Sequence, residues 1–554
     1  MKRARLSRVL YLPLVAAAFV VIIARPEAAA QKFYPDDPRH AETDDQDASR
    51  VRRSEITHAL DLWQAIRGAG DRSSRLAMNV NSTGEVPDSS WFTNRITHRP
   101  LSVADIARGP DTLPAPPSGP WTIVAGKTDG ITPGLRMKDG AGRLFFVKFD
   151  PRTNPEMASG AEVIATKLLF AAGYRVPENY IATVGRDDFI IGAEATFTGP
   201  DRKKRAMTTA DVDQVLRQAA RNANGSYRVV ASLSVEGRPV GPFQYFGTRP
   251  DDPNDVVPHE HRRELRALRV FAAWLNHVDT KGQNSLDTLV QADGRTVVRH
   301  YLLDFGSALG SAGTEPKDWR DGYEYGFDGR TALVALLTLG TSPPPWRRIH
   351  YPNLPAVGRI ESEHFEPERW KPTVPNPAFD NARADDTFWA AQRVMAFSND
   401  AIRAAVRTAR FSDPASSRYL SEVLINRRDR VGRAWLTAVN PVTDPSIDRQ
   451  GRLTFRNAAS DSGVATEPVE YRVRWSLFDN TTQVATALGP WTSIAGRASS
   501  FPTGVPATVD FVMAEIAAIH PRYPAWKNPV RAYFRRHDAR SWALAGFERP
   551  DGAN

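Results

Sequence analysis

Apolar and polar residues alternate in three short stretches that predict neighbouring strands: 121–125, 135–138 and 143–149. Glycines separate the first two stretches, and the turn Asp139–Gly142 joins the last two. In the third stretch the alternation places Phe146 and Lys148 on one face. This part of the chain therefore predicts a three-stranded antiparallel sheet that carries a lysine.

Apolar residues at helical spacing predict four longer helices: 158–172, 261–274, 386–410 and 414–436. Gly173 is placed to end the first helix, while Asp413 and Pro414 form a start signal for the last one. Further strands are expected at 180–184, 227–235 and 242–246. The mixture of strands followed by helices predicts an α+β fold.

The pattern changes again at the turn-rich junction 440–445. Beyond it, residues 471–477 alternate strictly between apolar and polar, and 453–456 and 530–534 also read as strands. We expect residues 446–554 to form a small, separable β-sandwich with a role in adhesion or docking. The proline-rich run 113–120 marks an earlier boundary, which separates an N-terminal extension, 31–120, from the sheet.

A length of 554 residues suggests two or three domains, and 41% apolar with 24% charged residues is ordinary for a globular protein. The chain has no cysteine, which excludes disulfides and thiolate metal sites. The aromatic pair Trp91 and Phe92 lies between turn-forming residues. We interpret this pair as pinning the extension onto the core, with a substrate-site role as the alternative.

The first 30 residues have the layout of a secretory signal peptide. Four basic residues precede the apolar run 9–24, and Ala28–Ala30 offers small residues for cleavage before Gln31. The alternative is an uncleaved membrane anchor, for which the run is short and contains Pro13. We expect an exported protein, periplasmic or extracellular, with no integral membrane segment after cleavage.

Cleavage at this position lowers the formal net charge from +9 to +5, because five basic residues and Glu27 are removed. The remaining chain is mildly basic and has no arginine-rich tract that could follow a nucleic-acid backbone. We therefore expect no nucleic-acid partner.

Two polar motifs carry the candidate chemistry. The first is His277-Val278-Asp279-Thr280-Lys281-Gly282-Gln283-Asn284, and the second is Asp304-Phe305-Gly306, which ends an apolar strand. Phosphoryl transfer needs an aspartate that positions the attacking hydroxyl, a lysine two residues on for the moving phosphate, and oxygen ligands for a metal ion. A solvated turn is the alternative for either motif alone. Two motifs in this order and separation favour a phosphoryl-transfer centre.

The order His-x-Asp-x-Lys-x-x-Asn followed by Asp-Phe-Gly resembles the protein-kinase fold, and the surrounding sequence resembles its HipA-like and phosphoinositide-kinase-like branch. The resemblance implies a two-lobed core, with an N-lobe over 121–250 and a helical C-lobe over 251–440. It implies that Asp279 is the base or hydroxyl-positioning group, with Lys281 as a phosphate stabiliser. Asn284 and Asp304 are then the metal ligands. Val278 replaces the arginine that reads a phosphorylated activation loop in protein kinases, so we expect no such control.

The same resemblance implies a nucleotide site in the N-lobe. Lys148 corresponds to the lysine of the third kinase strand, and Glu162 is its expected carboxylate partner; Glu156 is the alternative. Gly126 and Gly130 belong to a glycine loop that would cover the phosphates. The implied cofactors are ATP and Mg²⁺ or Mn²⁺.

We therefore expect an exported phosphotransferase that acts on a hydroxyl acceptor, whether protein, lipid headgroup or sugar. Two alternatives share the fold. One is a non-catalytic binding protein of the cell envelope, and the other is a nucleotidyltransferase. Because packing alone gives no reason to keep Asp279, Asn284 and Asp304 together, the polar positions favour an enzyme.

Overall fold

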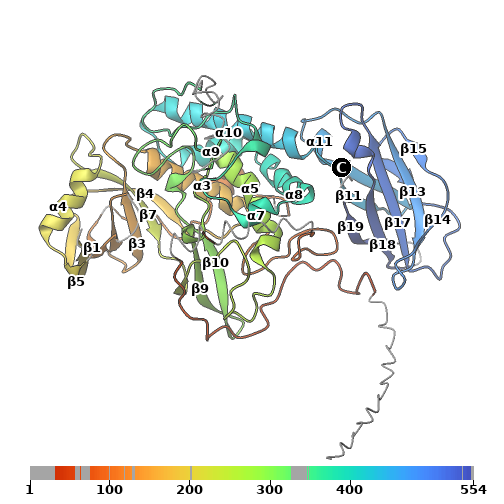
Figure 1. Ribbon diagram of the computed structural model, residues 1–554, viewed down its shortest axis with the longest axis horizontal. Helices are drawn as coiled ribbons and strands as arrows, with labels where there is room; N and C mark the ends of the chain where they lie inside the picture. The colour runs from red at the N-terminus through yellow and green to blue at the C-terminus, as the bar shows by residue number, and fades with distance from the viewer. Residues whose placement is uncertain are drawn as a thin grey trace, which may run out of the picture.

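The computed structural model describes residues 31–56, 63, 75–98, 100–117, 119–127, 132–199, 203–325, 346, 349–538 and 541–550. The predicted signal peptide, 1–30, lies outside them. Three bodies follow one another along the long axis: a twisted sheet, a helical body and a β-sandwich (Figure 1). In the described part of the chain, no helix is both long and apolar enough to cross a membrane.

The first body is a seven-stranded sheet in the order β4-β7-β3-β2-β1-β5-β6. Its strands are β1 Trp121–Gly126, β2 Gly134–Lys138, β3 Leu144–Phe149, β4 Asn179–Val184, β5 Phe189–Thr198, β6 Lys204–Ala206 and β7 Tyr227–Leu233. The three adjoining strands β1, β2 and β3 are confirmed, and Lys148 lies on β3. Strands β5 and β6 and helix α4 (Thr209–Gln218) were not predicted. Strands β5 and β6 extend the sheet beyond β1, and β5 pairs with β1 in parallel.

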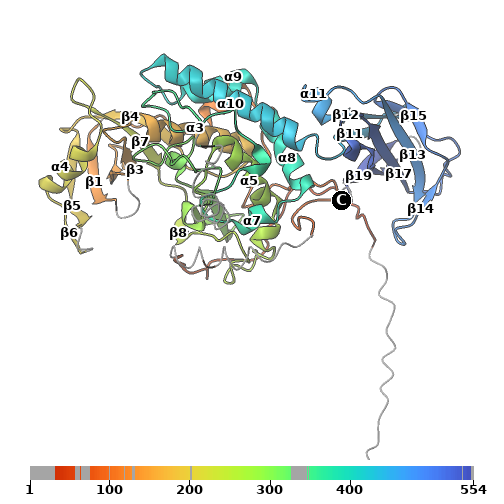
Figure 2. The same ribbon diagram turned by 45° about the horizontal axis from the view of Figure 1, so that its top comes forward.

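Helix α3 (Met157–Ala172) crosses from this sheet into the helical body, as both views show (Figures 1 and 2). Nearly all its residues are buried, which agrees with a sequence that is mostly apolar. Gly173 ends the helix with φ 130°, a conformation that favours glycine, and Phe92 packs where a Cβ would lie. The predicted C-cap is therefore confirmed.

The second body is mainly helical. Its helices are α2 Val103–Arg108, α5 Arg263–Leu275, α7 Pro377–Asp380, α8 Ala384–Met395, α9 Asn399–Arg407 and α10 Pro414–Trp435. The single helix predicted over 386–410 is wrong, because Ser398 accepts a hydrogen bond from the backbone of Ala401 and starts a new helix, α9. The start of α10 is confirmed, since Asp413 accepts from the Ala415 N–H and Pro414 is the first helical residue.

A three-stranded sheet in the order β10-β9-β8 lies beside these helices. The two motifs lie directly before β9 and after β10. Its strands are β8 Arg238–Gly241, β9 Ser285–Ala292 and β10 Arg295–Leu302. The strand predicted at 242–246 is wrong; β8 ends at Gly241 and the chain then turns away. The β9–β10 hairpin follows Asn284 and leads to Asp304, so it brings the two motifs back to one end of the sheet.

The third body is a β-sandwich of two antiparallel sheets with a short helix α11, Ala458–Asp461. One sheet contains β11 Val442–Ile447, β12 Arg452–Asn457 and β16 Ala498–Ser500. The other contains β13 Glu470–Phe478, β14 Ala485–Ala487, β15 Thr492–Ile494, β17 Phe511–Ile519, β18 Val530–Arg536 and β19 Trp542–Glu548. The strand predictions at 453–456, 471–477 and 530–534 are confirmed.

The sandwich is not joined to the helical body by an exposed linker. Asn440 is only 2% exposed, and its side-chain amide donates to the carbonyls of Ile516 and Asn528. The Trp526 indole N–H donates to the carbonyl of Thr437, which follows α10 (3.0 Å). One continuous apolar core therefore runs from the helices into the sandwich.

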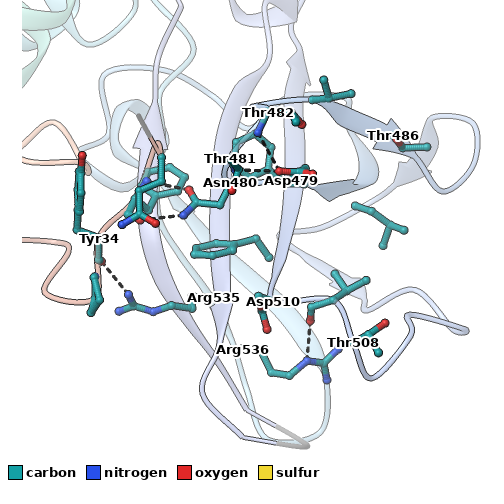
Figure 3. A pocket seen from close by; sticks show the side chains of 18 of the residues that line it. Tyr34, Asp479, Asn480, Thr481, Thr482, Thr486, Thr508, Asp510, Arg535 and Arg536 are labelled. Carbon is teal, nitrogen blue, oxygen red and sulfur yellow. Dashed lines mark hydrogen bonds between the residues drawn. The ribbon is translucent and has the colours of Figure 1, made fainter. Parts of the chain in front are cut away.

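The N-terminal extension contacts both the sandwich and the central part of the molecule that carries β10 (Figure 1). Phe33 is 3% exposed and packs between Phe478, Phe511 and Tyr533 of the sandwich. Figure 3 shows the pocket beside this contact, where Asn480 bonds the Phe33 backbone and Arg535 bonds the Tyr34 carbonyl. In the central part, Trp91 stacks on His300 of β10 with ring centroids 3.5 Å apart. The predicted pinning role of the buried Trp91 and Phe92 is confirmed.

Candidate active site

Lys148 links the sheet to the rest of the site. Its ammonium lies 2.8 Å from Glu162 Oε2 on α3 and 2.8 Å from Asp304 Oδ1 after β10. Burial alone would lower the pKa of Lys148, but the two carboxylates outweigh burial and raise it. Lys148 therefore stays charged and joins three separate segments of the chain.

Glu162 is the partner of Lys148, as expected, and Glu156 is not. The two oxygens of Glu162 also accept hydrogen bonds from the backbone N–H groups of Phe305 (3.0 Å) and Gly306 (2.9 Å). Glu156 instead accepts from the backbone N–H of Ser412. A fully buried carboxylate thus fixes α3 to the turn that carries Asp304.

Asp304 has the left-handed backbone conformation, with φ 61° and ψ 56°. This conformation is uncommon outside glycine, and such strain concentrates at functional sites. The charge of Lys148 lowers the pKa of Asp304 to about 2, against an opposing effect of burial. Protein surrounds the carboxylate on most sides, yet 49% of the side-chain surface remains exposed. Asp304 is therefore an ionised carboxylate that a ligand can reach.

The first motif lies beside it. Lys281 forms an ion pair with Asp279 at 2.9 Å, and the Asn284 amide donates to the backbone carbonyl of Asp279 (2.7 Å). The N–H of Leu303, the residue before Asp304, donates to the Asn284 carbonyl (2.9 Å). The structure thus brings the two motifs together, as their order in the sequence predicted.

Asp279 is also ionised. Burial raises its pKa, but the charge and hydrogen bond of Lys281 outweigh burial, and the net shift is downward. The side chains of Asp279 and Lys281 are 26% and 23% exposed, so both are partly accessible to a ligand. A carboxylate and an ammonium held in this way can orient a hydroxyl and neutralise a phosphate.

The donor set fits a hard divalent cation. Asp304 offers a carboxylate and Asn284 an amide oxygen, since its nitrogen is used by Asp279. Among the described residues, no group of three or more acidic, histidine or cysteine side chains could hold a metal ion by itself. This combination suits Mg²⁺ or Mn²⁺, which bind one or two protein ligands together with nucleotide phosphates.

The glycine loop is only partly described. Gly130 lies outside the described residues. Gly126 ends β1, and a Cβ there would meet the ring of Phe197 on β5 at 2.8 Å. Gly126 therefore has a packing reason to be glycine, and its contact with phosphate remains a prediction.

The sequence analysis gave no role to His277, although it is part of the first motif, and did not identify Lys317. His277 is buried against the Phe305 ring, and burial lowers its pKa to about 4. Lys317, in the loop after Gly306, is 8% exposed, and its charge acts on both Asp279 and His277. The position of His277 in its motif was a signal that it belongs to the site. No local pattern marks Lys317, because the fold of the loop places it.

No protein-family model and no curated protein sequence matches the chain. Solved structures of kinases match parts of this chain, at low identity and low TM-score. A Helicobacter pylori proinflammatory kinase, CtkA, is 13% identical with a TM-score of 0.29, over 55% of this chain and 90% of that one. A Golgi casein kinase is 10% identical with a TM-score of 0.28, over 72% and 96% of the two chains. The same kinase with Mn/ADP bound is 11% identical with a TM-score of 0.29, over the same shares.

The fold is α+β, with a sheet-based lobe and a helical lobe that meet at the site. Because the TM-scores are low, these structures carry no argument about the active centre. The description of the active centre rests on this chain's own geometry. That geometry is a lysine on β3 paired with a glutamate on α3, and an Asp-Phe-Gly turn beside a loop with Asp279 and Asn284. The HipA-like resemblance remains a prediction.

Proposed function

We propose that this chain is an exported ATP- and metal-dependent phosphotransferase that acts on a hydroxyl-bearing acceptor. The observation that carries the proposal is the bridge from Lys148 to both Glu162 and Asp304, 2.8 Å on each side. An ammonium at the junction of two lobes can bind nucleotide phosphates. The two carboxylates beside it keep it protonated.

Each polar group then has one task. Lys148, positioned by Glu162, binds phosphate oxygens of the nucleotide, and Asp304 and Asn284 hold the metal ion. The metal, when bound, neutralises the charge that develops on the phosphates. Asp279 orients the acceptor hydroxyl and accepts its proton, while Lys281 stabilises the transferred phosphoryl group.

The exposure of these groups favours an enzyme over a non-catalytic binding protein. Asp304 has φ 61° and a half-exposed side chain, so the turn presents its carboxylate to solvent and does not bury it. Asp279 and Lys281 pair with each other, and both side chains are partly accessible. Both are therefore positioned to contact a ligand. Export rests on the basic and apolar pattern of residues 1–30.

Labelled ATP tests the proposal directly. The purified protein is incubated with Mn²⁺, an envelope extract and ATP labelled either at the γ- or at the α-phosphate. Transfer of the γ label to an acceptor supports phosphotransferase activity, and transfer of the α label identifies a nucleotidyltransferase instead. If neither label moves and ATP does not bind, the protein is a binding module. Intact-mass analysis of the exported form tests cleavage before Gln31.

A further inference from the structure

The loop after the Asp-Phe-Gly turn is fixed against the residues that precede the first motif. The Leu309 N–H donates to the carbonyl of Leu275 (2.8 Å), at the end of α5. At the far end of the loop, a Cβ on Gly322 would lie 2.5 Å from Asn276 Oδ1. Both ends of the segment 309–322 are therefore held beside residues 275–276, directly before His277.

Lys317 lies within this segment and has a fixed backbone. Its N–H donates to the Gly310 carbonyl (2.8 Å), and its carbonyl accepts from the Arg359 guanidinium (2.5 Å). Ser311 and Pro316 pair across a short hairpin immediately before it. These contacts fix the backbone at Lys317, and the residue is 8% exposed.

The ammonium of Lys317 has no ion pair within 4.0 Å among the residues that the structure describes, whereas Lys148 and Lys281 are both paired. Burial lowers the pKa of Lys317, and the carboxylates of Asp321 and Asp279 only partly oppose this effect. A buried cation without a partner destabilises a protein unless a ligand supplies the opposite charge. Packing alone therefore does not account for a lysine at this position.

We propose that Lys317 binds an anionic group of the acceptor, so that the acceptor is a hydroxyl compound with a phosphate or carboxylate close to its reactive hydroxyl. The inference rests on the proposed phosphotransferase function and names the acceptor class for the same site. Lys148 and Lys281 serve the nucleotide and the transferred phosphoryl group, which leaves Lys317 for the acceptor.

The position of Lys317 supports this assignment. The carboxylates that act on it most strongly are Asp321, in its own loop, and Asp279, which orients the acceptor; Asp304, the metal ligand, comes after them. Lys317 therefore lies in a segment that is held beside the first motif, and its charge acts on Asp279. An ammonium there can recognise either anion as a point charge.

The test measures anion binding with the nucleotide site already filled. The wild type, Lys317→Met, Lys317→Arg and Arg320→Met are saturated with a non-hydrolysable ATP analogue and Mn²⁺. Each is then titrated with inorganic phosphate, acetate or chloride, and the melting temperature is recorded. Arg320→Met is the matched control, because Arg320 lies in the same loop but is half exposed and paired with Asp318.

We expect phosphate or acetate, but not chloride, to raise the melting temperature of the wild type, and the more effective anion identifies the acceptor group. Lys317→Met should need at least about tenfold more anion, a difference of about 1.4 kcal/mol. Lys317→Arg and Arg320→Met should respond like the wild type. Without ligands, Lys317→Met should melt at the same temperature as the wild type or higher, because a buried unpaired charge has been removed.

Equal anion responses in the wild type and Lys317→Met would overturn the inference. So would a ligand-free Lys317→Met that melts several degrees below the wild type, since Lys317 would then be structural. If the ATP analogue itself causes no shift, the proposed function fails. The anion titration is then read on the ligand-free proteins, where the same tenfold difference is expected, so the two failures are distinguishable.

Discussion

The Gly306 N–H donates a 2.9 Å hydrogen bond to Glu162 Oε2, the same oxygen that pairs with Lys148. A Cβ at position 306 would lie 3.0 Å from that oxygen, which leaves little room for any other residue. Helix α3 therefore cannot shift without disturbing the turn that carries Asp304. Lys148, the proposed nucleotide lysine, and Asp304, the proposed metal ligand, are coupled through one carboxylate.

This coupling predicts the effect of Glu162→Gln. The variant keeps the shape of the side chain but removes the charge that pairs with Lys148, so we expect a loss of about 1.5–3 kcal/mol in the free energy of unfolding. The affinity for ATP with Mn²⁺, measured by calorimetry, should fall at least about tenfold. Glu156→Gln is the control, because Glu156 bonds Ser412 and lies outside the site. Equal affinities for both variants would contradict the coupling.

Two further variants separate nucleotide binding from chemistry. In the wild type, ATP with Mg²⁺ or Mn²⁺ at about 100 times its Kd should stabilise the protein by about 2.7 kcal/mol, and ATP without metal should not. Asp304→Asn should abolish this effect, because it removes the metal carboxylate.

Asp279→Ala should keep most of the ATP stabilisation and lose phosphoryl transfer by about 100-fold or more, because Asp279 acts on the acceptor. Melting curves and label transfer measure the two effects separately. Loss of ATP binding in Asp279→Ala, or its survival in Asp304→Asn, would show that these roles are wrongly assigned.

His277 predicts a pH dependence of stability. Burial lowers its pKa from 6.5 to about 4, so between these values the unfolded chain binds a proton that the folded protein does not. The contribution of His277 is complete above pH 6.5 and is lost as the pH falls towards 4, up to about 3 kcal/mol. Denaturant titrations of His277→Asn at pH 7 and pH 5 should give a smaller difference than the wild type gives. The exposed His350→Asn should behave as the wild type does.

Phe33 predicts that the N-terminal extension stabilises the sandwich. Phe33→Ala should cost about 3–5 kcal/mol in the free energy of unfolding, because it leaves a cavity among three aromatic rings. In the wild type, residues 440–443 are buried, so a protease should cut there slowly. Faster cleavage in Phe33→Ala, but not in the control Tyr34→Ala, is the expected result; Tyr34 is 43% exposed. A Phe33→Ala variant as stable as the wild type would mean that the sandwich folds without the extension.

The sequence predicted those elements whose signals are local. Helix α10 begins at Asp413 and Pro414 because its capping signal lies within a few residues, and Lys148 lies on β3 because alternation defines the strand. The motif around Asp279 and the turn at Asp304 could be paired in advance because a single hairpin connects them. These signals also led to the identification of Glu162, within the first turns of α3.

The remaining features depend on contacts between distant segments. Strand β5 joins the sheet through a parallel pairing with β1, and no turn residue announces such a partner. The burial of Lys317 follows from the path of its loop past Gly310 and Arg359, so its sequence resembles that of any polar loop. The packing of Phe33 against Phe511 could not be read from periodicity, because the two segments lie at opposite ends of the chain.

The contact of Phe33 with the sandwich also bears on the order in which the protein is assembled. The ribosome makes Phe33 early, and its partner Asn480 follows 447 positions later. Strands β17 and β18, which supply Phe511 and Tyr533, emerge later still. The nascent chain therefore cannot complete this aromatic cluster until almost all of it has been synthesised, and a truncated product would leave Phe33 without its aromatic partners.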